Sequence, residues 1–282
     1  MKLQSLIVAI LLAFPAAAMD IPANWTTPIE PFNVVGNIYY VGTAELSSWL
    51  IVTDEGYILL DAPLDENVPL LLANIETLGF DPKKIAILLN SHAHLDHAGG
   101  FAAITAKTGA RLYMSRADAE LAARGGKGDF AFGDGAAYPP VAADRIIADG
   151  EKVTLGATTL TAMITPGHTK GNTTWTTRVR DGDRDLLVVF APSLSAPGYT
   201  LVDNHEYRSI VGDYCATFER LAKLKPDVFL ATHGSFFDLE TTAAARRRGK
   251  GANPFIAPTR YGEFVSYWKD RFEKELASQE AE

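Results

Sequence analysis

The chain has 282 residues, 47% of them hydrophobic and 21% charged, which is an ordinary composition for a globular protein with a sizeable core. It carries 26 Lys and Arg against 34 Asp and Glu, a formal net charge of -8. The basic residues are scattered apart from Arg246-Arg247-Arg248, which we interpret as an exposed helix face. This charge balance argues against nucleic acid as a partner.

Residues 1–18 predict a secretory signal peptide. Lys2 gives the positive start, residues 3–14 form an apolar core, and Ala16-Ala17-Ala18 is a small-residue cleavage site. We therefore expect a mature chain of residues 19–282 that forms one domain. No other stretch of the sequence approaches the ~20 apolar residues of a membrane span. The expected product is an exported, periplasmic monomer that is not bound to a membrane after signal cleavage.

Apolar runs and turn signals divide the chain into strands and helices. In the first half we expect strands at 34–41, 48–53 and 56–61, a helix at 68–78, a strand at 85–89, a helix at 98–108, a strand at 111–114 and a helix at 116–124. In the second half we expect strands at 153–155, 158–164, 173–180 and 186–190, a helix at 206–223, a strand at 226–231 and a helix at 262–277. Strands followed by helices, twice over, predict two sheets packed face to face with helices outside.

A long glycine-rich loop is predicted at residues 125–143. Connections longer than about 12 to 15 residues are uncommon unless they have a function, such as covering a site. An ordered surface loop that Phe130, Phe132 and Tyr138 anchor to the core is an equally good interpretation. Both interpretations stay open.

Three imidazoles and a carboxylate lie within six residues, directly after the predicted strand at 85–89. They belong to His92, His94, Asp96 and His97. A turn at the end of a buried strand can direct such side chains at one point while the sheet holds the backbone. Zinc prefers these nitrogen and oxygen donors, so the pattern predicts a metal site.

Two further histidines follow strands in turns that contain glycine. His168 lies after the strand at 158–164, and His233 lies after the strand at 226–231. Five of the six histidines in the chain thus occupy strand ends, where a sheet edge can gather them. The sixth, His205, is interpreted as a surface residue. The single cysteine, Cys215, excludes an internal disulfide, and we expect it to fill the core.

These motifs resemble the metallo-β-lactamase superfamily, whose signature is His-x-His-x-Asp-His. Segments 37–42, 58–61, 166–169, 193–199 and 251–255 are similar to the third subclass of true class B β-lactamases. The resemblance covers essentially the whole mature chain. It implies an α+β fold, a four-layer αββα sandwich of two mixed sheets with helices on the outer faces.

The resemblance also implies two zinc ions per chain. The first is expected on His92, His94 and His168, and the second on Asp96, His97 and His233. The implied activity is hydrolysis of the β-lactam amide of penicillins, cephalosporins and carbapenems by a metal-bound hydroxide, with Asp96 orienting that hydroxide. A small-molecule β-lactam is therefore the expected substrate, and antibiotic resistance the expected consequence.

Ser193 separates branches of the superfamily better than the histidines do. The equivalent turn carries a metal-bridging aspartate in glyoxalase II and many lactonases, and a cysteine ligand in the first lactamase subclass. Ser193 and Ser195 match positions with which the third subclass binds the drug carboxylate. Pro192 precedes them. Because proline fixes φ and has no backbone N–H donor, it changes the backbone of this turn.

Two alternatives remain beside the β-lactamase hypothesis. One is another exported hydrolase of the same fold, such as a lactonase or a thioesterase-like enzyme, which Ser193 disfavours. The other is a non-enzymatic periplasmic zinc-binding protein. Structural zinc sites fill all four positions with Cys and His, whereas this ligand set leaves positions open.

Overall fold

The computed structural model describes residues 20–249 and 251–282. The predicted signal peptide lies outside these residues. Among the residues described, no helix is both long enough and apolar enough to span a membrane.

The first sheet has seven strands in sequential order. β1 to β4 run antiparallel, whereas β4 to β7 run parallel. The strands are β1 (Phe32–Val35), β2 (Ile38–Tyr40), β3 (Trp49–Thr53), β4 (Gly56–Leu60), β5 (Ile85–Leu89), β6 (Arg111–Ser115) and β7 (Arg145–Ile147).

The second sheet has five strands in the order β12-β11-β10-β9-β8. Its pairs are antiparallel except for β11 and β12, which run parallel. The strands are β8 (Lys152–Leu155), β9 (Thr158–Ile164), β10 (Thr173–Asp181), β11 (Arg184–Ala191) and β12 (Val228–Ala231). Both sheets are therefore mixed.

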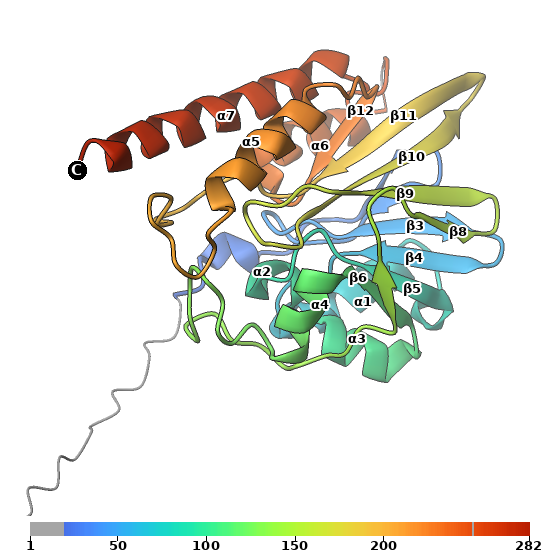
Figure 1. The fold of residues 1–282 in the computed structure, drawn as a ribbon. Coiled ribbons are helices and arrows are strands. Elements are labelled where there is room, and N and C mark those ends of the chain that lie inside the picture. The colour runs from blue at the N-terminus through green and yellow to red at the C-terminus, as the bar shows by residue number, and fades with distance from the viewer. Residues whose placement is uncertain (1–19, 250) are drawn as a thin grey trace, which may run out of the picture.

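Helices cover the outer faces of the two sheets (Figure 1). α1, α3 and α4 pack on the first sheet, and α5 and α7 pack on the second. The helices are α1 (Val68–Thr77), α2 (Leu95–Ala98), α3 (Phe101–Thr108), α4 (Arg116–Ala123), α5 (Ile210–Leu221), α6 (Leu239–Arg247) and α7 (Pro258–Glu280). The predicted four-layer sandwich is confirmed.

The main core lies between the sheets and continues beneath α5 and α7. Trp49 of β3 and Trp175 of β10 are both buried in it, each 1% exposed. A second cluster lies between the first sheet and the helices α1, α3 and α4. Burial of so much apolar surface holds the strand ends rigidly, which is what a site built from turns requires.

Several predicted elements need correction. The strand expected at 34–41 is a hairpin, because Gly36 turns the chain with φ +51° between β1 and β2. The helix expected at 98–108 is interrupted at Gly99 and Gly100. A Cβ on Gly99 would lie 3.0 Å from the carbonyl oxygen of Pro63, so this turn packs against the segment after β4. Strand β7 was not predicted, and of helix α6 only the helical face at Arg246-Arg247-Arg248 was expected.

The start of the helix expected at 206–223 was also wrong. The side chain of Asn204 accepts hydrogen bonds from the backbone N–H groups of Glu206 and Tyr207, at 3.0 and 2.8 Å. These bonds favour a turn over a helix. The helix α5 consequently begins only at Ile210.

Cys215 was predicted to lie in the core, and that prediction was wrong. Its thiol is free and exposed on α5. The buried face of α5 is formed by Tyr214, Phe218 and Leu221. Cys215 follows Tyr214 by one residue, and one residue rotates a helix by about 100°, which turns the cysteine toward solvent.

The basic triplet is only partly the exposed face that was expected. Arg247 and Arg248 are exposed, but Arg246 is half-buried. Its guanidinium donates to the backbone oxygen and the Oδ1 atom of Asn33, at 3.1 and 2.9 Å. Arg246 therefore ties α6 to β1.

Candidate metal centre

The predicted site residues follow strands at one end of the paired sheets. Asp61 follows β4, residues 90–97 follow β5, and His168 lies in the turn after β9. Ser193 follows β11, and His233 follows β12. The structure therefore brings together side chains that are far apart in the sequence.

The first group of donors consists of His92, His94 and His168, all of them buried. Their ligand atoms lie within 4.8 Å of one another. Nδ1 of His94 lies 3.1 Å from Nε2 of His168. Nε2 of His92 is buried and has no hydrogen-bond partner among the residues that the structure describes.

The second group consists of Asp96, His97 and His233. Nε2 of His97 lies 3.2 Å from Nε2 of His233 and 3.1 Å from Oδ2 of Asp96. Nε2 of His233 lies 3.4 Å from the same carboxylate oxygen. His92 adjoins this group as well, because its ligand atom lies within 4.8 Å of those of Asp96 and His97.

The outer contacts of His168 and His92 fix which ring nitrogen carries hydrogen. Nδ1 of His168 lies 2.7 Å from the backbone oxygen of Ser195, which can only accept, so Nδ1 carries the hydrogen. The Ser91 hydroxyl donates to Asp61 at 2.7 Å, so it accepts from Nδ1 of His92 at 3.1 Å. In the neutral ring, Nε2 of each histidine then carries no hydrogen and has a free lone pair.

Carboxylates face the outer nitrogens of the other three histidines. Oδ2 of Asp129 lies 3.6 Å from Nε2 of His94, and Oδ2 of Asp61 lies 3.5 Å from Nδ1 of His97. Oε1 of Glu45 lies 3.4 Å from Nδ1 of His233. A carboxylate favours hydrogen on the nitrogen that faces it, as it does behind metal-binding histidines. In the neutral rings, all five inner nitrogens are thus left as acceptors.

This donor set fits metal cations. Lone pairs that face each other at 3.1 and 3.2 Å repel unless a proton or a cation lies between them. Imidazole nitrogens and one carboxylate are donors that zinc prefers, and their outer contacts hold the rings in place. The chemistry of both groups therefore fits a metal ion, and the geometry of His92, His94, His168, Asp96 and His97 would allow one to be held.

The titration behaviour of the two groups differs. Burial, together with the neighbouring histidines, holds the pKa of His92 well below its usual range and lowers the pKa of His168 to about 3. Burial opposes charge on His97 too, but Asp96 and Asp61 outweigh it and raise its pKa to about 10. His97 and His233 hold the pKa of Asp96 well below its usual range despite burial. The second group therefore attracts positive charge.

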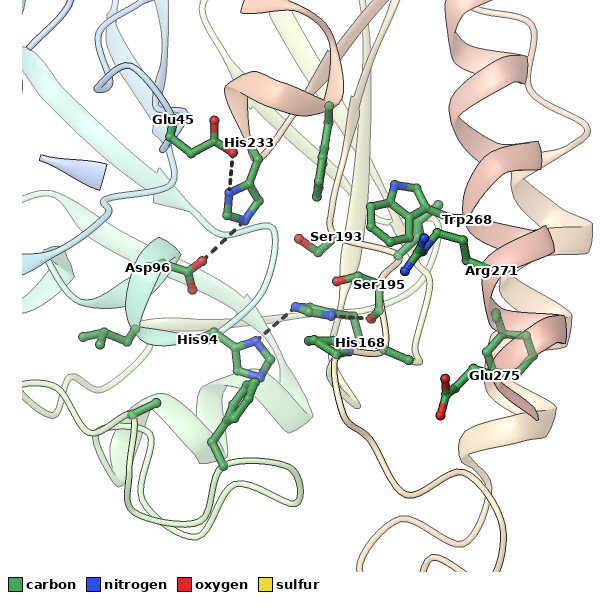
Figure 2. A pocket seen from close by; sticks show the side chains of 18 of the residues that line it. Glu45, His94, Asp96, His168, Ser193, Ser195, His233, Trp268, Arg271 and Glu275 are labelled. Carbon is green, nitrogen blue, oxygen red and sulfur yellow. Dashed lines mark hydrogen bonds and ion pairs between the residues drawn. The ribbon is translucent and has the colours of Figure 1, made fainter. Parts of the chain in front are cut away.

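The donors open into a cavity of about 480 Å³. Figure 2 shows His94, Asp96, His168 and His233 on one side of it, with the side chains of α7 opposite. Ser193 and Ser195 both line the cavity. Ser193 is buried and its Oγ lies 3.2 Å from Oγ1 of Thr232, whereas Ser195 is only half-buried.

A family comparison identifies this arrangement. The sequence profile of the Metallo-beta-lactamase superfamily matches residues 45–233, which contain all six predicted donors. The chain belongs to the metallo-beta-lactamase superfamily. Members of this superfamily are hydrolases, and the chain is a metal-binding hydrolase.

Solved metallo-β-lactamases share the fold over nearly the whole chain. One from Cronobacter sakazakii, described by a HARLDQ motif, is 44% identical, covers 92% of this chain and 98% of its own, and has a TM-score of 0.88. The subclass B3 enzyme BJP-1 of Bradyrhizobium japonicum is 40% identical, covers 92% and 98%, and has a TM-score of 0.87. The class B3 di-zinc enzyme LRA-12 from an Alaskan soil metagenome is 32% identical, covers 92% and 98%, and has a TM-score of 0.86.

The motif of this metallo-β-lactamase superfamily member is richer in donors than HARLDQ. Residues 92–97 read HAHLDH, so imidazoles stand at His94 and His97 in place of Arg and Gln. A curated hydroxyacylglutathione hydrolase of Fuscovulum blasticum is 26% identical over 180 residues, which are 64% of this chain and 58% of that protein. The chain thus spans less than two thirds of that curated relative.

The loop 125–143 both covers part of the site and is anchored to the core, as its two interpretations expected. Phe132 lines the cavity and meets the ring of His94 at a centroid distance of 5.1 Å. The hydroxyl of Tyr138 donates to the backbone oxygen of Ala93 at 2.7 Å, which anchors the loop beneath the donors. The loop also carries Asp129, which sequence reasoning missed.

Three other contributors were missed as well. Glu45 and Asp61 stand behind histidines, and α7 forms a wall of the cavity. Asp61 directly follows β4 and has φ +63°, a conformation that is uncommon outside glycine. An aspartate directly after a buried strand is a signal that could have indicated it.

Proposed function

We propose that the protein is an exported, periplasmic, dizinc β-lactamase that acts as a monomer on penicillins, cephalosporins and carbapenems and so supports antibiotic resistance. Four observations support this proposal. The donors form two adjoining groups, the outer contacts leave their inner nitrogens bare, the cavity admits a small molecule, and related structures are β-lactamases. Cavities of this size suit ligands of drug dimensions.

In this proposal His92, His94 and His168 hold the first zinc, and Asp96, His97 and His233 hold the second. Zinc on these ligands supplies Lewis acidity and a reactive water near neutral pH. Asp96 remains ionised because its pKa is held low, so with zinc bound its carboxylate would be able to accept a hydrogen bond from such a water and orient it. Phe132 packs on His94 and excludes bulk solvent from that side of the donors.

Ser193 and Ser195 are proposed to bind the substrate carboxylate. They lie in the turn after β11, on the cavity side, close to the metal donors (Figure 2). Ser195 also presents its backbone oxygen to His168 at 2.7 Å, so one turn positions both a metal donor and the substrate. The turn thereby fixes the position of the bound substrate relative to His168.

The observation that carries the proposal is the identity of Ser193 in the turn after β11. Ser193 contributes a neutral hydroxyl there, bonded to Thr232, where a thioesterase or lactonase of this fold is expected to carry an aspartate. A neutral residue leaves the second group with Asp96 as its one carboxylate ligand. A zinc ion held by this group would then have room for a substrate group.

A thioesterase remains the second candidate, because a curated hydroxyacylglutathione hydrolase matches part of the chain. The two functions are separated by assaying zinc-loaded residues 19–282 against a carbapenem and against a hydroxyacylglutathione thioester. We expect kcat/KM to favour the carbapenem by about 100-fold or more, because the site is complementary to one transition state. Cleavage of the thioester without opening of the carbapenem would establish the second candidate instead.

A further inference from the structure

Helix α7 forms the wall of the cavity that faces the metal donors. Its side chains Trp268, Arg271, Phe272 and Glu275 line the cavity, although α7 lies far from the motif in sequence. The arrangement is visible in Figure 2. α7 thus contributes chemistry to the site that no motif of the sequence predicted.

Contacts through Tyr214 and through Gln279 connect α7 to the segment that follows β11. The ring of Phe272 stacks on Tyr214 of α5 at 4.6 Å, and the Tyr214 hydroxyl donates to the backbone oxygen of Ser195 at 2.6 Å. Further along, the Gln279 side chain donates to the oxygen of Tyr199 at 2.8 Å and accepts from the N–H of Leu201 at 2.7 Å. The helix and the serine turn therefore form one rigid unit.

Arg271 is the only Lys or Arg among the residues that line this cavity. The ion pairs of Lys and Arg in the described part of the chain are formed by other residues. Its guanidinium lies 5.8 Å from the ring of Tyr267, and otherwise extends into the cavity toward Ser195 (Figure 2). A planar guanidinium without a carboxylate partner is suited to bind one.

The other charges of the cavity explain where an anion would lie. Glu45 and Asp96 are already engaged by histidines, at 3.4 and 3.1 Å. Glu275 lines the same wall as Arg271 and repels an anion placed beside it. The space between Arg271 and the Ser195 hydroxyl is the place where a carboxylate meets attraction without repulsion.

We propose that Arg271 determines specificity for anionic substrates, by pairing with the carboxylate that Ser195 binds from the opposite side. The inference rests on the proposed function, because it assigns a role at the same site. It makes α7 part of the substrate-binding surface. The expected ligand class is a compact molecule that carries one carboxylate near its reactive amide.

The first test compares Arg271→Gln with Arg271→Lys and with Lys269→Ala. Lys269 is exposed on the same helix, pairs with Glu273 and does not line the cavity, so its variant loses the same charge outside the site. For a carboxylate-bearing β-lactam we expect KM of Arg271→Gln to rise about tenfold with little change in kcat, since a hydrogen bond to a charged group is lost. Arg271→Lys keeps most of the affinity, and Lys269→Ala leaves KM within about twofold.

The second test removes the charge from the substrate instead. With the methyl ester of the same β-lactam, wild type and Arg271→Gln should have equal KM. Raising the salt concentration should weaken the wild type for the acid but not for the ester, because screening acts on the ion pair. An Arg271→Gln variant that folds normally and has unchanged KM for the acid overturns the proposal.

The third test does not depend on hydrolysis. Binding of 3-mercaptopropionate and of its uncharged amide to the zinc-loaded protein is measured by calorimetry. We expect the wild type to prefer the acid about tenfold, and Arg271→Gln to lose that preference. If no β-lactam is opened but this preference depends on Arg271, the proposed function fails while the anion site stands. If the preference is absent from the wild type, the anion site fails.

Discussion

Nδ1 of His94 and Nε2 of His168 lie 3.1 Å apart on the floor of the cavity, and neither nitrogen has hydrogen of its own in the neutral rings. The hydrogens lie on the far side of the rings, where Asp129 and the backbone of Ser195 hold them. Two lone pairs at this distance could supply two of the four ligands of one zinc ion. The protein folds with its ligand nitrogens already oriented, which reduces the entropy that metal binding costs.

Replacement of Asp96 by alanine should abolish most of the activity without unfolding the protein. Its carboxylate is the negative donor of the second group, 3.1 Å from His97, and its side chain is 14% exposed. We expect kcat for a chromogenic cephalosporin to fall by about 100-fold or more, and bound zinc to fall from two ions to one. Asp65→Ala, which changes an exposed carboxylate, is the control. Full activity of Asp96→Ala would show that the second site is misassigned.

The two serines should differ in their effects on KM. Ser195 is half-buried and its hydroxyl faces the cavity, so Ser195→Ala should raise KM for a β-lactam about fivefold. Ser193 shares its hydroxyl with Thr232, so Ser193→Ala should raise KM less and cost about 1 kcal/mol in the free energy of unfolding. Steady-state kinetics and urea unfolding measure the two effects. The reverse order of KM values contradicts this division.

Asp129 should act through His94 rather than on the substrate. It stands 3.6 Å from Nε2 of His94, and its carboxylate accepts from the N–H groups of Ala131 and Phe132. Asp129→Asn should lower the affinity for zinc about tenfold, because the ring loses its orienting partner. Asp134→Asn, in the same loop but bonded only to the N–H of Gly128, is the matched control. Zinc affinity is measured by competition with a chelating dye, and equal affinities for the two variants would exclude the orienting role.

Asp118 should make stability fall as pH rises. Burial raises its pKa to about 6 from an ordinary 3.8, although the hydrogen bond from Asn90 acts in the other direction. The folded protein therefore holds a proton that the unfolded chain releases between these values, so the contribution is present below pH 3.8 and lost as pH rises through about 6. Its size is about 3 kcal/mol.

The pH effect of Asp118 is isolated by comparison with Asp118→Asn. The difference in unfolding free energy, wild type minus variant, should fall by about 2 kcal/mol between pH ~4 and pH ~7 in metal-free protein. Urea unfolding across this range measures it, and the contributions of groups that do not interact with Asp118 cancel in the difference. A difference that does not change with pH contradicts the assignment.

Sequence patterns predicted the architecture because strands and helices here follow apolar periodicity closely. The failures occurred where tertiary contact overrides a local pattern. The apolar run from Val34 to Val41 concealed a turn at Gly36, and Cys215 followed an apolar neighbour yet faces solvent. Helix α6 is short and mostly polar, and it is held by the buried side chains of Leu239 and Ala243, which no local periodicity indicated.

The donors of the candidate site were predictable because the motif packs four of them into residues 92–97. The residues that contact the outer side of these donors were not predictable, because they come from distant segments of the chain. Asp129 reaches His94 from a loop, and Arg271 reaches the cavity from the last helix. A contact of this kind depends on how the sheets and α7 pack, which a single sequence does not display.

The most direct test of the central claim is hydrolysis of a carbapenem by residues 19–282, measured with zinc, after exhaustive chelation, and after zinc is restored. We expect ring opening that is lost on chelation and recovered with zinc, at two zinc ions per chain. A folded protein that binds two zinc ions and leaves the carbapenem intact would contradict it.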